Sequence, residues 1–338
     1  MGCMGLAFAP NSHSSNTMGK VIKTLRKSIN AFLHFYHSLA SIAAILIFPF
    51  SASVILSQSL SPSYFPILRT LYHRIQLLFQ AAGFPASSQF FSLLNLKLSQ
   101  TIFSFTATLP FTLTLLLLAK ASVILIVKEF PYKRFTPPPF SCLLRLFGFL
   151  LPTHLFNSFI ILSANAAFFS IIFLVFNVFD VLYISSVNVI LVLSAGSAIF
   201  YSIVLANTMV VCNLAIVVAA MESCGGYLPI LKACVLIRGR EATAITLALP
   251  ANLAMAAIEA LFQYRIVKPW QNSRSLNVSV IWEAFSITYM HSLLIVIDVI
   301  INCMLYKSCR KSSRSSCWES GVDYHLELEP EEKEDLEA

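Results

Sequence analysis

The chain has 338 residues, of which 57% are hydrophobic and only 12% are charged. Soluble domains carry about 25% charged residues, so this composition excludes an ordinary soluble enzyme or binding domain and indicates a bilayer protein. The formal net charge of +7 averages a basic N-terminal half and an acidic C-terminus: no Asp or Glu precedes Glu129, and nine of the sixteen lie between Glu319 and Glu337. Basic residues interleaved with apolar runs usually set membrane topology, so the charge does not indicate nucleic-acid binding.

Residues 1–31 form a basic segment that we expect in the cytosol. Its first residues, MGC, could support acylation of Gly2 and Cys3, although Leu6 stands where the myristoylation pattern expects Ser or Thr. Further on, GKVIKTLRKSINAF carries basic or polar residues every three or four positions beside apolar ones. This pattern predicts an amphipathic helix on the anionic cytosolic leaflet.

Six segments are long and apolar enough to cross a bilayer, since a span needs roughly 20 mostly apolar residues. They predict an all-α integral membrane protein, a bundle of about six transmembrane helices with interfacial amphipathic helices. The N-terminal segment, loops 2–3 and 4–5 and the residues just after the sixth span hold 15 Lys and Arg residues, against six in the other loops, so the positive-inside rule places both termini in the cytosol. The membrane domain is expected over residues 32–306, with spans at 32–56, 102–127, 155–179, 187–210, 243–263 and 281–306.

The loop after the first span contains SYFPILRTLYHRIQLLFQAAG. Its apolar residues from Leu68 to Ala82 recur at helical spacing, while polar residues occupy the other faces. Pro66 suits the first turn of a helix, and Gly83 suits the position just past its end. The pattern predicts a second interfacial helix on the non-cytosolic side.

From Val210 the sequence reads VVCNLAIVVAAMESCGGYLPILKACVLIRGREATAITLALP. An apolar helix ends in an acid, and a glycine turn, a short amphipathic helix and a basic RGR follow. This stretch resembles the central element of a plant-specific family of multi-pass membrane proteins that have six predicted spans and no established biochemical activity. The resemblance, sharpest over residues 205–250, implies no catalytic residues, and its recurring feature matches at Glu222, Gly226, Lys232 and Gly239.

Residues 222–240 also make physical sense as a cytosolic interfacial hairpin. The glycines permit a sharp exit from the fourth span, Pro229 can start the short helix and Gly239 can stop it. Such a hairpin could simply fix the orientation of the protein through its positive charge. The alternative is a surface that docks a cytosolic protein or a lipid headgroup.

Lys120 interrupts the apolar run LTLLLLAKASVILIV, and Asp298 lies at a matching depth in the sixth span. A charge near the bilayer centre costs at least about 2.5–3.5 kcal/mol. We therefore hypothesise a Lys120–Asp298 ion pair that joins the second span to the sixth. In the alternative, each side chain snorkels separately, Lys120 toward the cytosolic headgroups.

The last two spans carry further polar residues. Helical geometry places His291, Asp298 and Asn302 on one stripe of the sixth span, and Glu259 lies in the fifth. His and carboxylate side chains are the usual groups of a proton relay, so the stripe could line a proton or solute pathway. It could equally hold helices together.

The sequence contains no recognisable catalytic motif: HExxH, GxSxG, GxxxxGK and GxGxxG are all missing. The eight cysteines form no CxxC pair and have no zinc-type spacing, so we expect neither a metal nor a cofactor. We therefore do not expect an enzyme.

These observations predict a membrane scaffold or regulator that acts through loop 222–240 and its tails, with the bilayer and a cytosolic protein as partners. The alternative is a small-solute or proton-linked transporter or channel that uses the polar residues of the fifth and sixth spans. Residues 307–338, basic and then acidic, are expected to be a disordered cytosolic tail. The first span reads as a signal-anchor, which favours the endomembrane system or the plasma membrane over a plastid membrane.

Overall fold

The computed structural model describes residues 13–59, 66–81, 89–128, 130, 140–181, 187–273 and 278–320. Every regular element in these ranges is a helix, which confirms the all-α class. Three short π-helical turns, labelled η, continue the helices in which they lie. In chain order the elements are α1 (His13–His34), α2 (Tyr36–Ile42), η1 (Ala43–Ile47), α3 (Phe48–Ser59), α4 (Pro66–Ala81), α5 (Gln89–Phe111), η2 (Thr112–Leu116), α6 (Leu117–Lys128), α7 (Phe140–Val181), α8 (Val187–Glu222), α9 (Leu228–Ile237), α10 (Glu241–Phe262), η3 (Gln263–Val267), α11 (Lys268–Ser273) and α12 (Val278–Ser320).

Six helical stretches within the described ranges are long and apolar enough to cross a membrane, so the chain is a polytopic membrane protein. Several of them extend beyond the expected boundaries, the second beginning at Ser92 and the fifth ending at Trp270. The third begins well before residue 155, because the helix accommodates Pro152, and the fourth runs past residue 210, because VVCNLAIVVAAM offers no glycine or proline to end it. The six stretches are Tyr36–Ser57, Ser92–Lys128, Ser141–Ile172, Leu191–Glu222, Glu241–Trp270 and Val278–Arg310.

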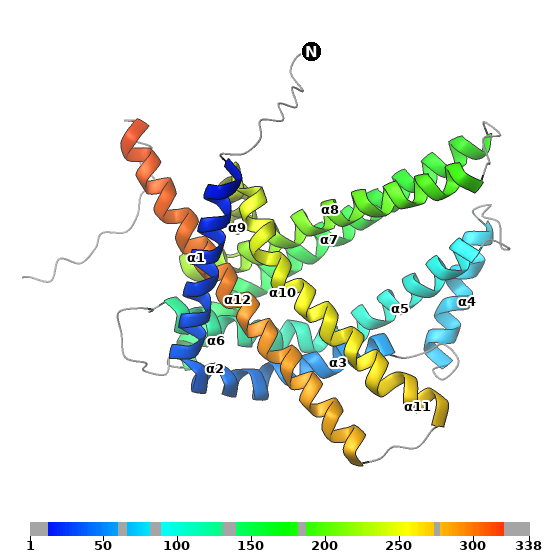
Figure 1. Ribbon diagram of the computed structural model, residues 1–338, viewed down its shortest axis with the longest axis horizontal. Coiled ribbons are helices and arrows are strands. Elements are labelled where there is room, and N and C mark those ends of the chain that lie inside the picture. The colour runs from blue at the N-terminus through cyan, green and yellow to red at the C-terminus, as the bar shows by residue number, and fades with distance from the viewer. Residues whose placement is uncertain are drawn as a thin grey trace, which may run out of the picture.

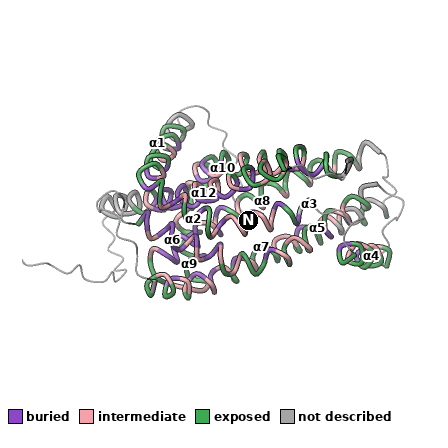
Figure 2. The backbone as a smooth tube through the Cα atoms, turned by 90° about the horizontal axis from the view of Figure 1, so that it is seen from below, coloured by how far each residue is buried: buried purple, intermediate pink, exposed green. Residues whose placement is uncertain are grey.

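The six stretches meet at one end of the molecule and spread apart toward the other (Figure 1). We call the meeting point the convergent end; there α6 ends at Lys128, α8 ends at Glu222 and α10 begins at Glu241. Away from it, α7 pairs with α8, α3 with α5, and α10 with α12. Most of the buried core lies in the half nearest the convergent end (Figure 2), including most of residues 116–127, 214–220 and 295–306.

The amphipathic helix expected after the first span forms as α4. Leu68 and Ile75 are buried, whereas Arg69 and Arg74 are exposed, and the helix packs against α5. Its apolar residues thus meet protein on one side. Its placement in the plane of a membrane interface stays a prediction.

The C-terminal segment differs from expectation, because α12 continues beyond residue 306 to Ser320. Residues 307–320 are thus helical where the sequence predicted disorder. At the start of this extension, the ammonium group of Lys307 donates hydrogen bonds to the carbonyls of Val127 at 2.8 Å and Phe130 at 3.1 Å. These bonds hold the helix against α6. Residues 321–338, where most of the acidic tail lies, fall outside the described residues.

The turn after α8 approaches the α7 backbone closely, which gives a test of the packing. A Cβ atom on Gly225 would lie 3.0 Å from the Phe149 carbonyl oxygen. We therefore expect Gly225→Ala to destabilise the folded protein by about 1–3 kcal/mol through overpacking. The measurement is thermal unfolding in detergent, with Gly148→Ala as the matched control, since a Cβ there meets nothing within 4 Å. Equal stability of both variants would contradict this contact.

Candidate functional site

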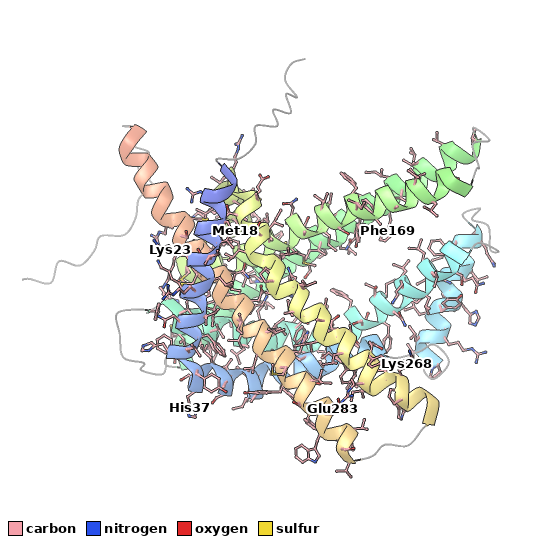
Figure 3. All side chains as sticks on the ribbon, viewed as in Figure 1. Met18, Lys23, His37, Phe169, Lys268 and Glu283 are labelled. Atoms are coloured by element: carbon pink, nitrogen blue, oxygen red, sulfur yellow. The ribbon has the colours of Figure 1, made fainter. Side chains whose placement is uncertain are left out.

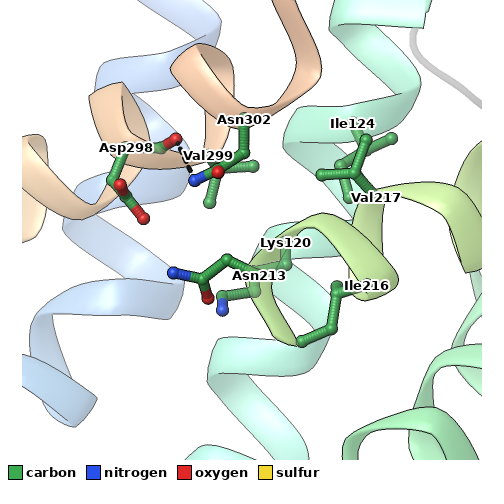
Figure 4. A pocket seen from close by; sticks show the side chains of 8 residues that line it. All are labelled: Lys120, Ile124, Asn213, Ile216, Val217, Asp298, Val299 and Asn302. Atoms are coloured by element: carbon green, nitrogen blue, oxygen red, sulfur yellow. Dashed lines mark hydrogen bonds between the residues drawn. The ribbon is translucent and has the colours of Figure 1, made fainter. Parts of the chain in front are cut away.

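A small cavity inside the bundle gathers polar side chains from three helices (Figure 4). Its polar lining consists of Lys120 from α6, Asn213 from α8, and Asp298 and Asn302 from α12. The cavity volume is about 10 Å³, which is roughly enough for one water molecule. In this conformation the cavity can therefore hold a water between the charged groups, but no larger solute. The remaining lining is apolar: Ile124, Ile216, Val217 and Val299.

The structure brings Lys120 and Asp298 to the same cavity, and the two side chains interact electrostatically. None of the ion pairs among the described residues joins them directly. The Asn213 side chain points into the same space (Figure 4). The amide of Asn302 donates a 2.8 Å hydrogen bond to the backbone carbonyl of Asp298. Opposite charges that share one cavity lower the cost of burying each of them, while a direct Lys120–Asp298 ion pair stays a prediction.

The rest of the expected polar stripe forms a separate contact between α10 and α12. His291 Nε2 lies 3.7 Å from Glu259 Oε1. The His291 side chain is only 4% exposed, and within the described residues its Nδ1 atom has no hydrogen-bond partner. Asp298 lies two helical turns further along α12, about 10 Å away along the axis. The residues of the stripe thus fall into two separate places. His291 contacts Glu259, whereas Asp298 and Asn302 line the cavity.

Two polar residues of α7 lie near this region and were missed by sequence reasoning. Asn157 donates a 2.9 Å hydrogen bond to the carbonyl of Cys212 on α8, and His154 is close enough to interact with the charge of Lys120. Among the described residues, Asn157 Oδ1 and His154 Nδ1 are buried without a hydrogen-bond partner. Sequence reasoning placed the start of the third span at residue 155, which put His154 in a loop. A polar side chain inside an apolar helix would have been the signal.

The convergent end holds a second polar cluster, built on Glu222 at the end of α8. One carboxylate oxygen accepts a hydrogen bond from Lys232 of α9 at 2.7 Å, and the other accepts one from the Tyr306 hydroxyl of α12 at 2.8 Å. The hydrogen bond to Glu222 raises the pKa of Lys232 above its ordinary value, so this lysine stays charged at neutral pH. The sequence already predicted that Glu222 and Lys232 belong to the same 222–240 hairpin. Tyr306 was missed, because it lies 84 residues away in the sequence.

The two glycines of the family-like element occupy turn positions that favour glycine. Gly226 has a φ of 88° and Gly239 a φ of 79°, in the region where a side chain is strained. The Gly226 amide also donates a 3.1 Å hydrogen bond to the Thr153 hydroxyl of α7. Between the two turns, α9 buries one face against the bundle. The loop from 222 to 240 is therefore an ordered hairpin fixed to α7, α8 and α12.

Gly2 and Cys3, the possible acylation sites, lie outside the described residues. In the part of the chain that the structure describes, no group of three or more His, Cys, Asp or Glu side chains is arranged to hold a metal ion.

A family model described as "Domain of unknown function (DUF8558)" matches residues 16–338, so the chain belongs to this family. The match covers nearly the whole chain, far more than the stretch 205–250 on which the sequence resemblance rests. No curated protein and no solved structure matches the chain.

Because Lys120 and Asp298 share one cavity, we expect the effect of each side chain on stability to depend on the other. We expect Lys120→Met and Asp298→Asn each to destabilise the protein by about 1–3 kcal/mol, because each leaves a polar group without its neighbour. The double variant should cost less than the sum of the two, which thermal unfolding in detergent can measure as a double-mutant cycle. Lys97→Met, on the exposed face of α5, is the control and should change little. Strict additivity of the two changes would show that the side chains do not interact.

Proposed function

We propose that the protein is a membrane scaffold or regulator, without catalytic activity of its own, that acts through its 222–240 hairpin. The observation that carries this proposal is the outward face of α9. Leu228 is 48% exposed, Leu231 56% and Val235 74%, and at helical spacing these three side chains share one face. Large apolar side chains that gather at an exposed site often mark a binding surface.

The way the hairpin is held supports a binding role. The other face of α9 is buried, and the Glu222–Lys232 ion pair and the Tyr306–Glu222 hydrogen bond connect the hairpin to α12. A surface that is already ordered loses little conformational entropy when a partner binds. The hairpin thus has the properties of a preformed docking surface.

The charge around this face favours a cytosolic protein with an apolar and acidic surface as the partner. Arg238 is exposed beside the apolar face, whereas Lys232 is paired with Glu222. Charges at the rim of an interface steer and select a partner. Insertion of the same face into lipid headgroups is the competing outcome that the experiment below distinguishes.

We also propose that the convergent end and both termini face the cytosol, in the endomembrane system or the plasma membrane of a plant cell. The 15 Lys and Arg residues of the N-terminal segment, loops 2–3 and 4–5 and the residues just after the sixth span, against six in the other loops, support this orientation. The plant origin rests on the resemblance around residues 205–250.

A proton-linked transporter is the second candidate, and the buried His291–Glu259 contact favours it. Histidine and carboxylate pairs at membrane depth are typical of proton relays. The small size of the cavity at Asp298 argues against solute passage in this conformation. Under this alternative, Glu259→Gln or Asp298→Asn would abolish flux in reconstituted vesicles while the protein still folds.

The docking proposal is tested by photocrosslinking in native membranes. A photoreactive residue in place of Leu231 or Val235 should yield a protein adduct of defined mass, because a partner covers this face. The matched control is Leu253, which is also highly exposed but lies on α10, and it should yield no such adduct. Arg238→Glu, combined with the probe at Val235, should reduce the adduct about tenfold or more by placing a like charge at the interface.

Lipid adducts alone at Leu231 and Val235, with yields like those at Leu253, would contradict a protein-docking role for α9. Equal adduct yield with and without Arg238→Glu would contradict the acidic character assigned to the partner.

A further inference from the structure

The first helix, α1, runs across the direction of the first span. The chain bends sharply at Phe35, which separates α1 from α2 and has a φ of −107° and a ψ of 22°. α1 then lies at the convergent end, crosswise to α2 and α3 (Figure 1), and it packs against α12 and α10. If α2 and α3 cross the bilayer, α1 lies along its surface.

One face of α1 is occupied by protein. Ser28 and Ala31 are almost completely buried, at 1% and 0% exposure, and Val21 is also buried. Phe35, directly after the helix, continues this face. These contacts fix the rotation of the helix about its own axis, and therefore decide which side chains face outward.

Next to the buried face runs a stripe of exposed apolar side chains. At 100° per residue, they fall within about 60° of arc on the helix. All are roughly half exposed or more, and the stripe ends at Leu33, close to the first span, which begins at Tyr36. Its members are Met18, Ile22, Ile29 and Leu33.

Basic residues follow on the third side of α1. Lys23, Arg26 and Lys27 are all exposed, and helical geometry places them on about 100° of arc beside the apolar stripe. Met18 and Lys23 are both marked on α1 in Figure 3. The helix contains no acidic residue, and the sequence has none before Glu129. Nothing within α1 therefore neutralises this charge.

We propose that α1 is an in-plane helix that binds the anionic phospholipid headgroups of the leaflet at the convergent end. Lys23, Arg26 and Lys27 contact the headgroups, and the apolar stripe inserts at the boundary with the acyl chains. The stripe ends close to the start of the first span, which favours lipid over an acidic protein, because a water-soluble acidic partner would leave these apolar side chains uncovered. Since α1 packs against α10 and α12, anionic lipid would hold the two last spans at this leaflet.

The experiment compares the full chain in nanodiscs of phosphatidylcholine with nanodiscs that also contain phosphatidylserine. Amide hydrogen exchange in residues 18–34 should slow when the anionic lipid is present, and the difference should disappear at high salt, which screens exposed charges. Each basic residue near an anionic surface contributes roughly a fivefold effect. The variant Lys23→Gln, Arg26→Gln, Lys27→Gln should therefore lose the difference, up to about a hundredfold.

The matched control is Arg69→Gln with Arg74→Gln in α4, which removes charge from exposed positions away from α1 and should keep the lipid effect. Unchanged exchange in residues 117–127 verifies that each variant is folded, and Lys23→Arg with Lys27→Arg should retain the full effect. Equal exchange of α1 in both lipid compositions would overturn the proposal and leave an acidic protein as the occupant of this face. The proposal would also be overturned if the α4 control lost the lipid-dependent difference in exchange to the same extent.

Discussion

Two neighbouring residues of α12 hold three other helices together at the convergent end. The Tyr306 hydroxyl binds Glu222 at the end of α8, Glu222 binds Lys232 of α9, and Lys307 donates to carbonyls at the end of α6. A helix leaves its last carbonyls without partners inside the helix, and a cation there satisfies them and is favoured by the helix dipole. These contacts tie the hairpin and the part of α12 around residue 306 to the ends of α8 and α6.

The convergence of the helices also explains why polar groups are tolerated deeper in the bundle. Where the helices meet, Lys120, Asn213, Asp298 and Asn302 face one cavity of about 10 Å³ instead of hydrocarbon. Buried polar groups are costly unless they find partners or water. Toward the other end the helices spread into pairs, and many large apolar side chains of α7 and α8 are exposed, as suits segments surrounded by lipid. The protein thus joins a tightly packed half, which carries the hairpin, to a half that lipid can surround.

Much of the fold could be predicted from the sequence, because hydrophobic length and helical periodicity are local properties. The six spans, the amphipathic helices and the hairpin glycines all follow from such patterns. The ends of α7 and α8 could not be placed, since an apolar helix can continue past the length that a bilayer requires. Tyr306, Lys307 and Asn213 were missed for another reason: their roles depend on contacts far away in the sequence. For Lys120 and Asp298, matched depth indicated that they share one region, whereas only the packing of the helices decides whether they touch.

The most direct test of this account is amide hydrogen exchange of α9 and of the end of α6 in the variant Tyr306→Phe, Lys307→Met. Hydrogen bonds to charged groups contribute about 1.5–3 kcal/mol, so the account predicts exchange about tenfold faster, or more, in residues 228–237 and 124–130. Exchange in residues 160–172 of α7, away from the convergent end, should remain unchanged. Unaltered exchange in α9 and α6 would show that Tyr306 and Lys307 do not hold the convergent end together.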